Sequence, residues 1–215
     1  MKIIKLSAID STNSFLKDLA LTSAIENFTV VAADCQLKGR GQQGSSWVSE
    51  PFKNLNFSVL VRFGSFHVSE KRYLNFAVSL AIFEVLSAEN IPDVAIKWPN
   101  DILSGNKKIC GILIENSLKG TEISSAVIGI GLNVNQTDFP ASLEKASSLQ
   151  LLLGKNFDLD RLLKKIILKL KLKIALLAAK EFRALEAAYL HVLFKKNIPT
   201  MFKDSKDALF MGMVL

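Results

Sequence analysis

Residues 94–134 hold short apolar runs separated by turn residues, and this pattern limits the fold more than any other part of the chain. Residues 94–97 predict a short strand, and residues 102–115 predict a hairpin that turns at 104–106, where the sequence reads Ser-Gly-Asn. Residues 123–134 predict a further strand, with two glycines at which another group can approach the backbone. Strands linked by hairpins are antiparallel neighbours, so this region is not a regular repeat of parallel strands joined by helices.

The rest of the chain supplies helices and the remaining strands. Apolar residues at helical spacing predict helices at four places: 14–21, 70–88, 142–153 and 159–194. Short apolar and β-branched runs predict strands at 1–9, 29–33 and 55–63, and two strand-like pieces follow Pro199. Strands and helices interleave with hairpins, which predicts an α+β fold in which helices pack on a mixed β-sheet.

Composition excludes several classes of protein. Of the 215 residues, 49% are hydrophobic and 22% are charged, which favours one substantial folded domain over a disordered chain. The most apolar region, residues 159–179, is interrupted by five lysines, whereas a membrane span needs about 18 apolar residues with few or no charges. Cys35 and Cys110 lie far apart in the sequence, as expected of reduced thiols in a cytoplasmic protein.

The net charge of +7 suggests a nucleic-acid partner. Many of the lysines, however, fall in residues 155–206 and largely on one face of a predicted helix, where charge is usually solvated. We therefore expect no nucleic-acid binding and no membrane association.

Two familiar motifs occur in the wrong context. Residues 39–44 match the dinucleotide-binding string G-x-G-x-x-G, but the residues that follow lack helical periodicity and reach a proline at Pro51. Residues 94–97 read Val-Ala-Ile-Lys, as in protein kinases, but the other kinase motifs do not follow. Both interpretations are rejected.

Three polar segments stand in otherwise apolar surroundings. The glycine loop, residues 39–47, places Arg40 between two glycines, so backbone N–H groups and a planar guanidinium can meet an anion. Residues 97–101 present an amide and a carboxylate at a strand end, and residues 107–115 carry Lys108 into an apolar run. Each segment alone also fits a structural explanation, namely a flexible loop, a capped turn and an exposed hairpin lysine.

Together the segments resemble the biotin protein ligase family. The strings GRGQQGSSW, KWPND, KKICGILIE and GIGLNVN occur in the family's order and spacing, and the resemblance covers residues 5–195. It implies, at residues 1–195, the biotin and lipoate ligase catalytic domain, which is like that of class II aminoacyl-tRNA synthetases. Residues 196–215 are then expected to be a remnant, or the truncated start, of a small C-terminal β-barrel. Because the first match is at Ser11, we expect a monofunctional member that lacks the N-terminal DNA-binding domain.

The resemblance also implies a role for each residue at a matching position. The residues expected to contact biotin are Ser11, Thr12, Gln36, Gly39, Arg40, Gly41, Lys108 and Gly111. The residues expected to contact ATP are Arg40, Trp47, Asn100, Lys108 and Asn133. The catalytic residues are expected to be Arg40, Lys108, Lys97 and Asp101, with Asp101 next to Mg²⁺.

The implied reaction activates biotin as biotinyl-5'-AMP and transfers it to a specific lysine of a biotin carboxyl carrier protein. Biotin and ATP are the expected substrates, Mg²⁺ is the expected ion, and the enzyme is expected to be a monomer or a homodimer. A carboxylate must first become a mixed anhydride before an amine can attack it, and fixed positive charge from Arg40 and Lys108 stabilises the phosphate charge in that step. The reaction needs no side-chain nucleophile. This agrees with the positions of the two histidines, His67 and His191, which lie outside every motif.

One position departs from the family pattern, and three alternatives stay open. Many members carry a second arginine where this chain has Gln42, which concerns how tightly the adenylate is retained. A lipoate or octanoate ligase or transferase shares the fold, although Ser11 and Gln36 suit a polar ureido ring better than an alkyl chain. A non-catalytic biotin or nucleotide sensor would bind ligand without releasing pyrophosphate, and a basic nucleic-acid binder is the third alternative.

Overall fold

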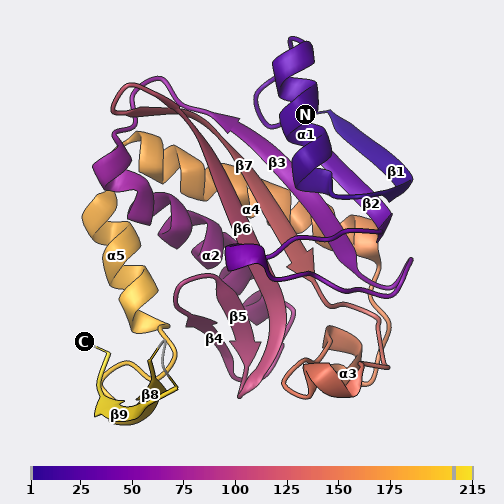
Figure 1. Ribbon diagram of the computed structural model, residues 1–215, viewed down its shortest axis with the longest axis vertical. Coiled ribbons are helices and arrows are strands. Elements are labelled where there is room, and N and C mark those ends of the chain that lie inside the picture. The colour runs from indigo at the N-terminus through magenta and orange to yellow at the C-terminus, as the bar shows by residue number, and fades with distance from the viewer. Residues whose placement is uncertain (1, 205–206, 215) are drawn as a thin grey trace.

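The computed structural model describes residues 2–204 and 207–214 and contains a seven-stranded sheet with the strand order β1-β2-β3-β7-β6-β5-β4 (Figure 1). Its strands are β1 (Ile3–Ile9), β2 (Val30–Gln36), β3 (Leu55–Arg62), β4 (Val94–Lys97), β5 (Asp101–Ser104), β6 (Lys107–Lys119) and β7 (Glu122–Leu132). Strands β1 and β2 pair in parallel and the other neighbours are antiparallel. The predicted α+β fold with a mixed sheet is therefore confirmed.

The hairpin predicted at residues 102–115 is also confirmed. Strands β5 and β6 are antiparallel, with Ser104 opposite Lys107, and Gly105 at the turn has a φ of 55°. That positive φ is readily adopted by glycine, which explains why the turn falls there. The hairpin continues through β6 into β7, so it forms one half of the sheet.

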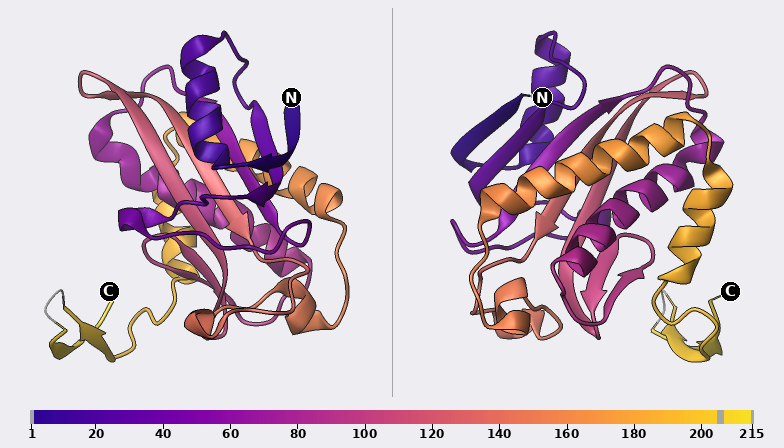
Figure 2. Two further views of the ribbon diagram at one scale, coloured as in Figure 1. Left: turned by 45° about the vertical axis from the view of Figure 1, so that its right-hand side comes forward. Right: turned by 180° about the vertical axis from the view of Figure 1, so that it is seen from behind.

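The two faces of the sheet are covered differently. Helices α2 (Lys71–Ala88) and α4 (Leu159–Ala178) lie side by side across one face, and α5 (Phe182–His191) runs beside them (Figure 2). Helix α1 (Thr12–Thr22) lies on the opposite face. Neighbouring strand residues reach the two different cores: Val30 packs under the large helical layer and Val31 under α1. This alternation is the period of two that a strand buried on both faces requires.

One expected long helix is two helices. Residues 159–194 were expected to form a single helix, but α4 ends at Ala178, α5 begins at Phe182, and Lys180 between them has a φ of 57°. The break turns α5 so that its aromatic rings stack on α2, with Phe182 on Tyr73 and Tyr189 on Phe76. Packing of these rings outweighs local helix propensity, which is a weak influence.

The prediction of a helix at residues 142–153 is largely wrong. Only α3 (Leu149–Leu153) is α-helical, after a 3₁₀ turn at Ala141–Leu143. The backbone between them pairs with β6 instead: Lys108 donates to the carbonyl of Lys145, and Ser147 donates to the carbonyl of Lys108. Ser148 then caps α3 by accepting a hydrogen bond from the N–H of Leu151.

The predicted pair of strands after Pro199 is confirmed as β8 (Thr200–Lys203) and β9 (Leu209–Gly212), an antiparallel hairpin beyond the end of α5. The division of the chain at residue 195, and the relation of residues 196–215 to a β-barrel, stay predictions. No helix within the described residues is long and apolar enough to cross a membrane.

Candidate active site

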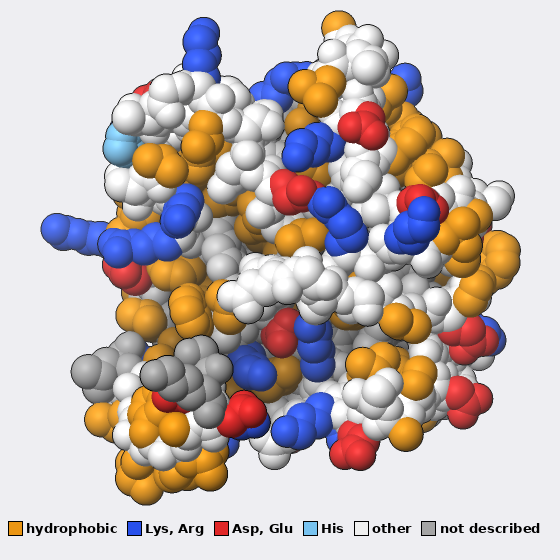
Figure 3. Space-filling view, viewed as in Figure 1, with side chains coloured by type: hydrophobic (Ala, Val, Ile, Leu, Met, Phe, Trp, Pro, Cys, Tyr) orange, Lys and Arg blue, Asp and Glu red, His pale blue; other side chains and the backbone are white. Residues whose placement is uncertain are grey.

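A cleft of about 520 Å³ opens on the face of the sheet that the large helical layer leaves uncovered. Its walls come from the start of α1, the end of β2, the glycine loop, the β4–β5 turn, the first half of β6 and the end of β7. Figure 3 shows the glycine-loop region crossing the centre of this face, with acidic and basic side chains in the hollow below it. Residues from segments far apart in sequence thus meet at one cleft.

The glycine loop is a tight hairpin. The N–H of Trp47 donates to the carbonyl of Gly39 at 2.9 Å, and the N–H of Gly41 donates to the carbonyl of Ser45 at 2.7 Å. A Cβ at Gly39 would overlap the Trp47 carbonyl, and one at Gly41 would overlap the Ser45 hydroxyl. These glycines therefore allow the two sides of the loop to approach each other. The loop leads into a 3₁₀ turn (Gln42–Gly44), not into the long helix that a dinucleotide fingerprint requires.

Trp47 packs against two glycines of the sheet. Gly111 and Gly131 are cross-strand partners on β6 and β7, and a Cβ at Gly131 would overlap the indole ring. The indole Nε1 donates to Asn56 Oδ1 at 2.9 Å, and Lys108 Nζ stands 5.8 Å from the ring centroid. The ring therefore forms a fixed wall of the cleft with a cation beside it.

Lys108 and Asp101 form an ion pair in the cleft, with 2.6 Å between Nζ and Oδ1. They come from the paired strands β6 and β5, so the hairpin register brings them together. Asn100 is also at the cleft, and its Nδ2 donates to the carbonyl of Ile112 at 3.1 Å. Lys97 is opposite Asp101 on β4 but lines a neighbouring cavity of about 940 Å³, whose lining shares the exposed Trp98, Asp101 and Lys108 with the cleft.

The other end of the cleft is polar and buried. Gln36 Oε1 accepts hydrogen bonds from Thr12, from the N–H at 2.8 Å and from Oγ1 at 3.0 Å. Ser11 precedes Thr12 as the N-cap of α1 and is also buried in the cleft wall. Ser58 Oγ lies 2.8 Å from Thr12 Oγ1 and 2.6 Å from Asn13 Oδ1, which extends this set of hydrogen bonds below the cleft.

A carboxylate that the sequence did not single out also belongs to the site. Glu115 on β6 forms an ion pair with Arg40 of the glycine loop and accepts a hydrogen bond from Asn13 Nδ2 at 2.9 Å. Burial alone would raise the pKa of Glu115, but the hydrogen bonds from Arg40 and Asn13 and the charges of Arg40 and Lys17 together lower it. The only sequence signal was a carboxylate at the end of the apolar string KKICGILIE.

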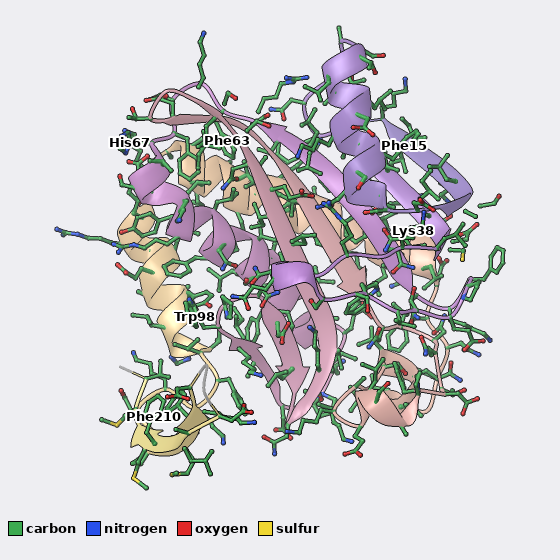
Figure 4. All side chains as sticks on the ribbon, viewed as in Figure 1. Phe15, Lys38, Phe63, His67, Trp98 and Phe210 are labelled. Carbon is green, nitrogen blue, oxygen red and sulfur yellow. The ribbon has the colours of Figure 1, made fainter. Side chains whose placement is uncertain are left out.

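Asn133 directly follows β7 and is not among the residues that line the cleft. Its Nδ2 donates to the carbonyl of Ser147 at 3.0 Å, and its N–H donates to the carbonyl of Ile109. Cys110 is fully buried in the helical core, and burial raises the pKa of its thiol. His67 lies at the outer edge of the molecule beside the start of α2, away from the glycine loop (Figure 4).

The number of carboxylates at the cleft determines how a metal ion could be bound there. Asp101 is the only carboxylate among the described residues that line the cleft, and no group of three or more His, Cys, Asp or Glu in the described part of the chain is placed to hold a metal ion. Mg²⁺ is often bound through one or two carboxylates, several waters and substrate phosphates. The donor set therefore fits an ion that arrives with a nucleotide.

These features define an α+β protein whose sheet is backed by helices on one face and carries, on the other, a small-molecule cleft under a glycine loop. The chain belongs to the biotin/lipoate A/B protein ligase family, whose model matches residues 6–133. The resemblance seen in the sequence is confirmed.

Relatives and solved structures agree with this family. The chain is 34% identical over 169 residues to the bifunctional ligase/repressor BirA of Bacillus spizizenii, covering 77% of this chain and 51% of that protein. It is 34% identical over 131 residues to the biotin–[acetyl-CoA-carboxylase] ligase of Paracoccus denitrificans, covering 60% of this chain and 53% of that protein. The chain thus spans about half the length of the curated relatives it matches.

A solved structure gives a closer match in length. The biotin protein ligase of Aquifex aeolicus in complex with biotin and ATP has a TM-score of 0.82 and 26% identity to this chain, with coverage of 99% of this chain and 86% of that one. The Leishmania major biotin protein ligase in complex with biotinyl-5-AMP has a TM-score of 0.73 and 22% identity, with coverage of 98% and 94%, and supports the fold.

Proposed function

We propose that the protein is an ATP-dependent biotin protein ligase, which forms biotinyl-5'-AMP and transfers the biotin to a lysine of a biotin carboxyl carrier protein. The observation that carries the proposal is the cleft itself. A buried polar end at Thr12 and Gln36 lies in one cleft with the cations Lys108 and Arg40, and Trp47 packs against its sheet wall. The names and bound ligands of the matched relatives support the same substrates.

In this proposal the polar end binds the ureido ring of biotin. The Gln36 amide and the Thr12 and Ser11 hydroxyls supply donors and acceptors that an alkyl chain cannot use. Gly111 and Gly41 approach the ligand through their backbones, whereas Gly39 packs against the Trp47 carbonyl and shapes the loop. The carboxylate end of biotin then points toward Lys108.

The first step forms a bond between a biotin carboxylate oxygen and the α-phosphorus of ATP, and pyrophosphate leaves. Both reactants are negative, and charge grows on the phosphoryl oxygens in the transition state. Lys108 and Arg40 both line the cleft and offer fixed positive charge, and holding the reactants in place supplies much of the remaining rate enhancement. Trp47 packs on the adenine ring. Asn133 Oδ1 is buried and has no hydrogen-bond partner among the described residues, so an acceptor for the adenine amino group is available while Nδ2 keeps its bond to Ser147.

The second step forms the amide bond between the acceptor lysine nitrogen and the biotinyl carbonyl, and AMP leaves. Asp101 is placed to orient that amine or accept its proton, and Asn100 holds the turn on which Asp101 stands. Lys97 lines the adjoining cavity and is proposed to serve the phosphates or the incoming acceptor. Asp101, together with the phosphates of ATP, would hold Mg²⁺, and the ion would supply further positive charge there.

We also propose a cytoplasmic protein that acts as a monomer or a homodimer. Support for the compartment comes from the cysteines, because Cys35 and Cys110 are both free thiols. The acceptor protein is inferred from the name of the Paracoccus denitrificans relative.

The test is pyrophosphate release from ATP and Mg²⁺ with biotin, lipoate or octanoate as the acid. Biotin-dependent release supports the proposal, and mass spectrometry of a mixture with biotin carboxyl carrier protein then shows whether a lysine is biotinylated. Release with lipoate or octanoate alone would keep the fold and change the substrate. Biotin binding without release would point to a sensor.

A further inference from the structure

Glu115 links the glycine loop to the base of the cleft. On the loop side it pairs with Arg40, and on the sheet side it accepts a hydrogen bond from Asn13, a residue of α1. Asn13 is itself held: its Nδ2 also reaches the carbonyl of Leu113 at 3.3 Å, and its Oδ1 lies 2.6 Å from Ser58 Oγ. Lys17 of α1 adds a more distant positive charge, 3.9 Å from Glu115 Oε1.

The arrangement leaves most of the Arg40 guanidinium available. The pair with Glu115 uses Nη2, whereas a guanidinium carries five N–H donors in a planar fork. Arg40 also lines the cleft, while Glu115 is not among the cleft-lining residues of the described chain. Glu115 therefore holds one edge of the fork from behind, and the remaining donors can face an anion in the cleft.

The sheet leaves room for Asn13 at Gly129. A Cβ at Gly129 would overlap the Asn13 amide, so the strand must lack a side chain there for Asn13 to lie over β7. Asn13 is 3% exposed, and a buried amide without its partners would be unfavourable. The route from Gln36 through Thr12, Ser58 and Asn13 to Glu115 is thus a continuous set of polar contacts beneath the cleft.

We propose that Glu115 is a positioning residue, which holds Arg40 and the glycine loop in place over the cleft before ligand binds. The inference rests on the proposed function for what the cleft binds, but the loop can be examined without it. In the resting protein Glu115 orders the loop, so binding of biotin does not have to order it. Without that carboxylate, part of the binding free energy is used to fix the loop, and the apparent affinity falls.

The direct readout is amide hydrogen exchange of the ligand-free protein. The N–H groups of Gly41 and Trp47 are hydrogen-bonded within the loop and report its opening. Glu115→Gln keeps an oxygen that can accept from Asn13 but removes the charge that holds Arg40. A half-exposed ion pair contributes only a small free energy, so we expect its loss to make these amides exchange about 5-fold faster. In the same variant, the KM for biotin should rise about 5-fold while kcat stays within about twofold.

Glu84→Gln is the matched control. Glu84 on α2 is likewise a half-buried carboxylate with two cationic partners, Lys169 and Lys173, but it lies on the helical face. Its substitution should leave exchange of the loop amides unchanged. A second check uses Arg40→Gln, which should free the loop as much as Glu115→Gln does, and the double variant should add nothing more.

Equal loop exchange in the wild type and Glu115→Gln would overturn the inference, as would equal effects of Glu115→Gln and Glu84→Gln. A lowered kcat at unchanged KM would overturn it too, because it would give Glu115 a role in the chemical step. If the wild type shows no biotin-dependent pyrophosphate release, the proposed function fails, whereas the exchange experiment still decides whether Glu115 holds the loop.

Discussion

Strand β7 serves two regions that are built in opposite ways. On the helical side, Ile128, Ile130 and Leu132 enter the main core beneath α2 and α4. On the cleft side the same stretch has Gly129 and Gly131, which carry no side chain where Asn13 and Trp47 lie against the strand. Along this one strand, every second residue therefore packs into the helical core, and the glycines between them leave room for side chains on the cleft face.

This difference separates stability from function. The helical face gains free energy from apolar surface removed from water, and many aliphatic side chains share that contribution. The cleft face gives up such contacts so that residues from α1 and the glycine loop can be placed on the sheet. Substitutions on the helical face should therefore change the unfolding free energy, and those on the cleft face should change ligand binding or catalysis.

The largest expected effect is on the helical face. Ile128 is fully buried, and Ile128→Ala should lower the free energy of unfolding by about 2–5 kcal/mol through lost burial and the cavity left behind. Urea denaturation measures the change. Biotin affinity of the folded protein, determined by calorimetry well below the transition, should be retained. A large loss of affinity at full folding would contradict the separation of the two faces.

The next effect is on the chemistry. Lys108→Ala should lower the rate of biotin-dependent pyrophosphate release about 100- to 1,000-fold, equivalent to about 2.7–4 kcal/mol of transition-state stabilisation. Lys107→Ala is the control, because Lys107 is the neighbouring exposed lysine, whose Nζ contacts the carbonyl of Glu144 outside the cleft. Near-normal release by Lys108→Ala would remove Lys108 from the catalytic step.

A smaller effect is expected where the cleft face has no side chain. In Gly131→Ala the new Cβ overlaps the Trp47 ring, so the indole must move from its place on the strand. We expect the KM for ATP to rise about 10-fold, close to 1.4 kcal/mol, which lies within the usual range for overpacking. Gly64→Ala has open space around its Cβ and should change nothing. An unchanged KM for ATP in Gly131→Ala would exclude the proposed stacking of Trp47 on adenine.

The sequence predicted the helical face and the sheet better than the connections. Strand and hairpin positions followed from alternating apolar residues and turn residues, since these are local signals. The break at Lys180 depends on stacking between α5 and α2, and the short α3 depends on backbone pairing with β6. Both are contacts between residues distant in sequence, which periodicity within a segment cannot reveal.

The cleft was predictable where a motif marked it. Arg40, Trp47, Asp101 and Lys108 do line one cleft, although their roles stay predictions. Glu115 was missed because its importance comes from two partners, on the glycine loop and on α1, and no local pattern shows that pairing. Asn133, Lys97 and Gly39 lie outside the cleft lining, because a motif gives a residue's position along the chain but not the direction in which it faces.

The smallest expected effect compares two carboxylates, one for each face. Burial would raise the pKa of Glu115, but the hydrogen bonds from Arg40 and Asn13 and the charges of Arg40 and Lys17 together hold it below its ordinary value of 4.5. The pKa of Glu84 is likewise lowered by Lys173 and Lys169 against opposing burial. A carboxylate with a lowered pKa stabilises the fold at pH values above its ordinary value, and this stabilisation is lost as the pH falls through the lowered value. Between pH 7 and 4.5 both contributions should therefore stay constant.

Below pH 4.5 the loop amides of Gly41 and Trp47, corrected for intrinsic exchange rates, should lose protection in the wild type but not in Glu115→Gln. Protonation of Glu84 should instead reduce the global unfolding free energy, and Glu84→Gln should remove that part of the pH dependence. If Glu84→Gln removed the loop's pH dependence, the two faces would be coupled and the comparison between them would fail.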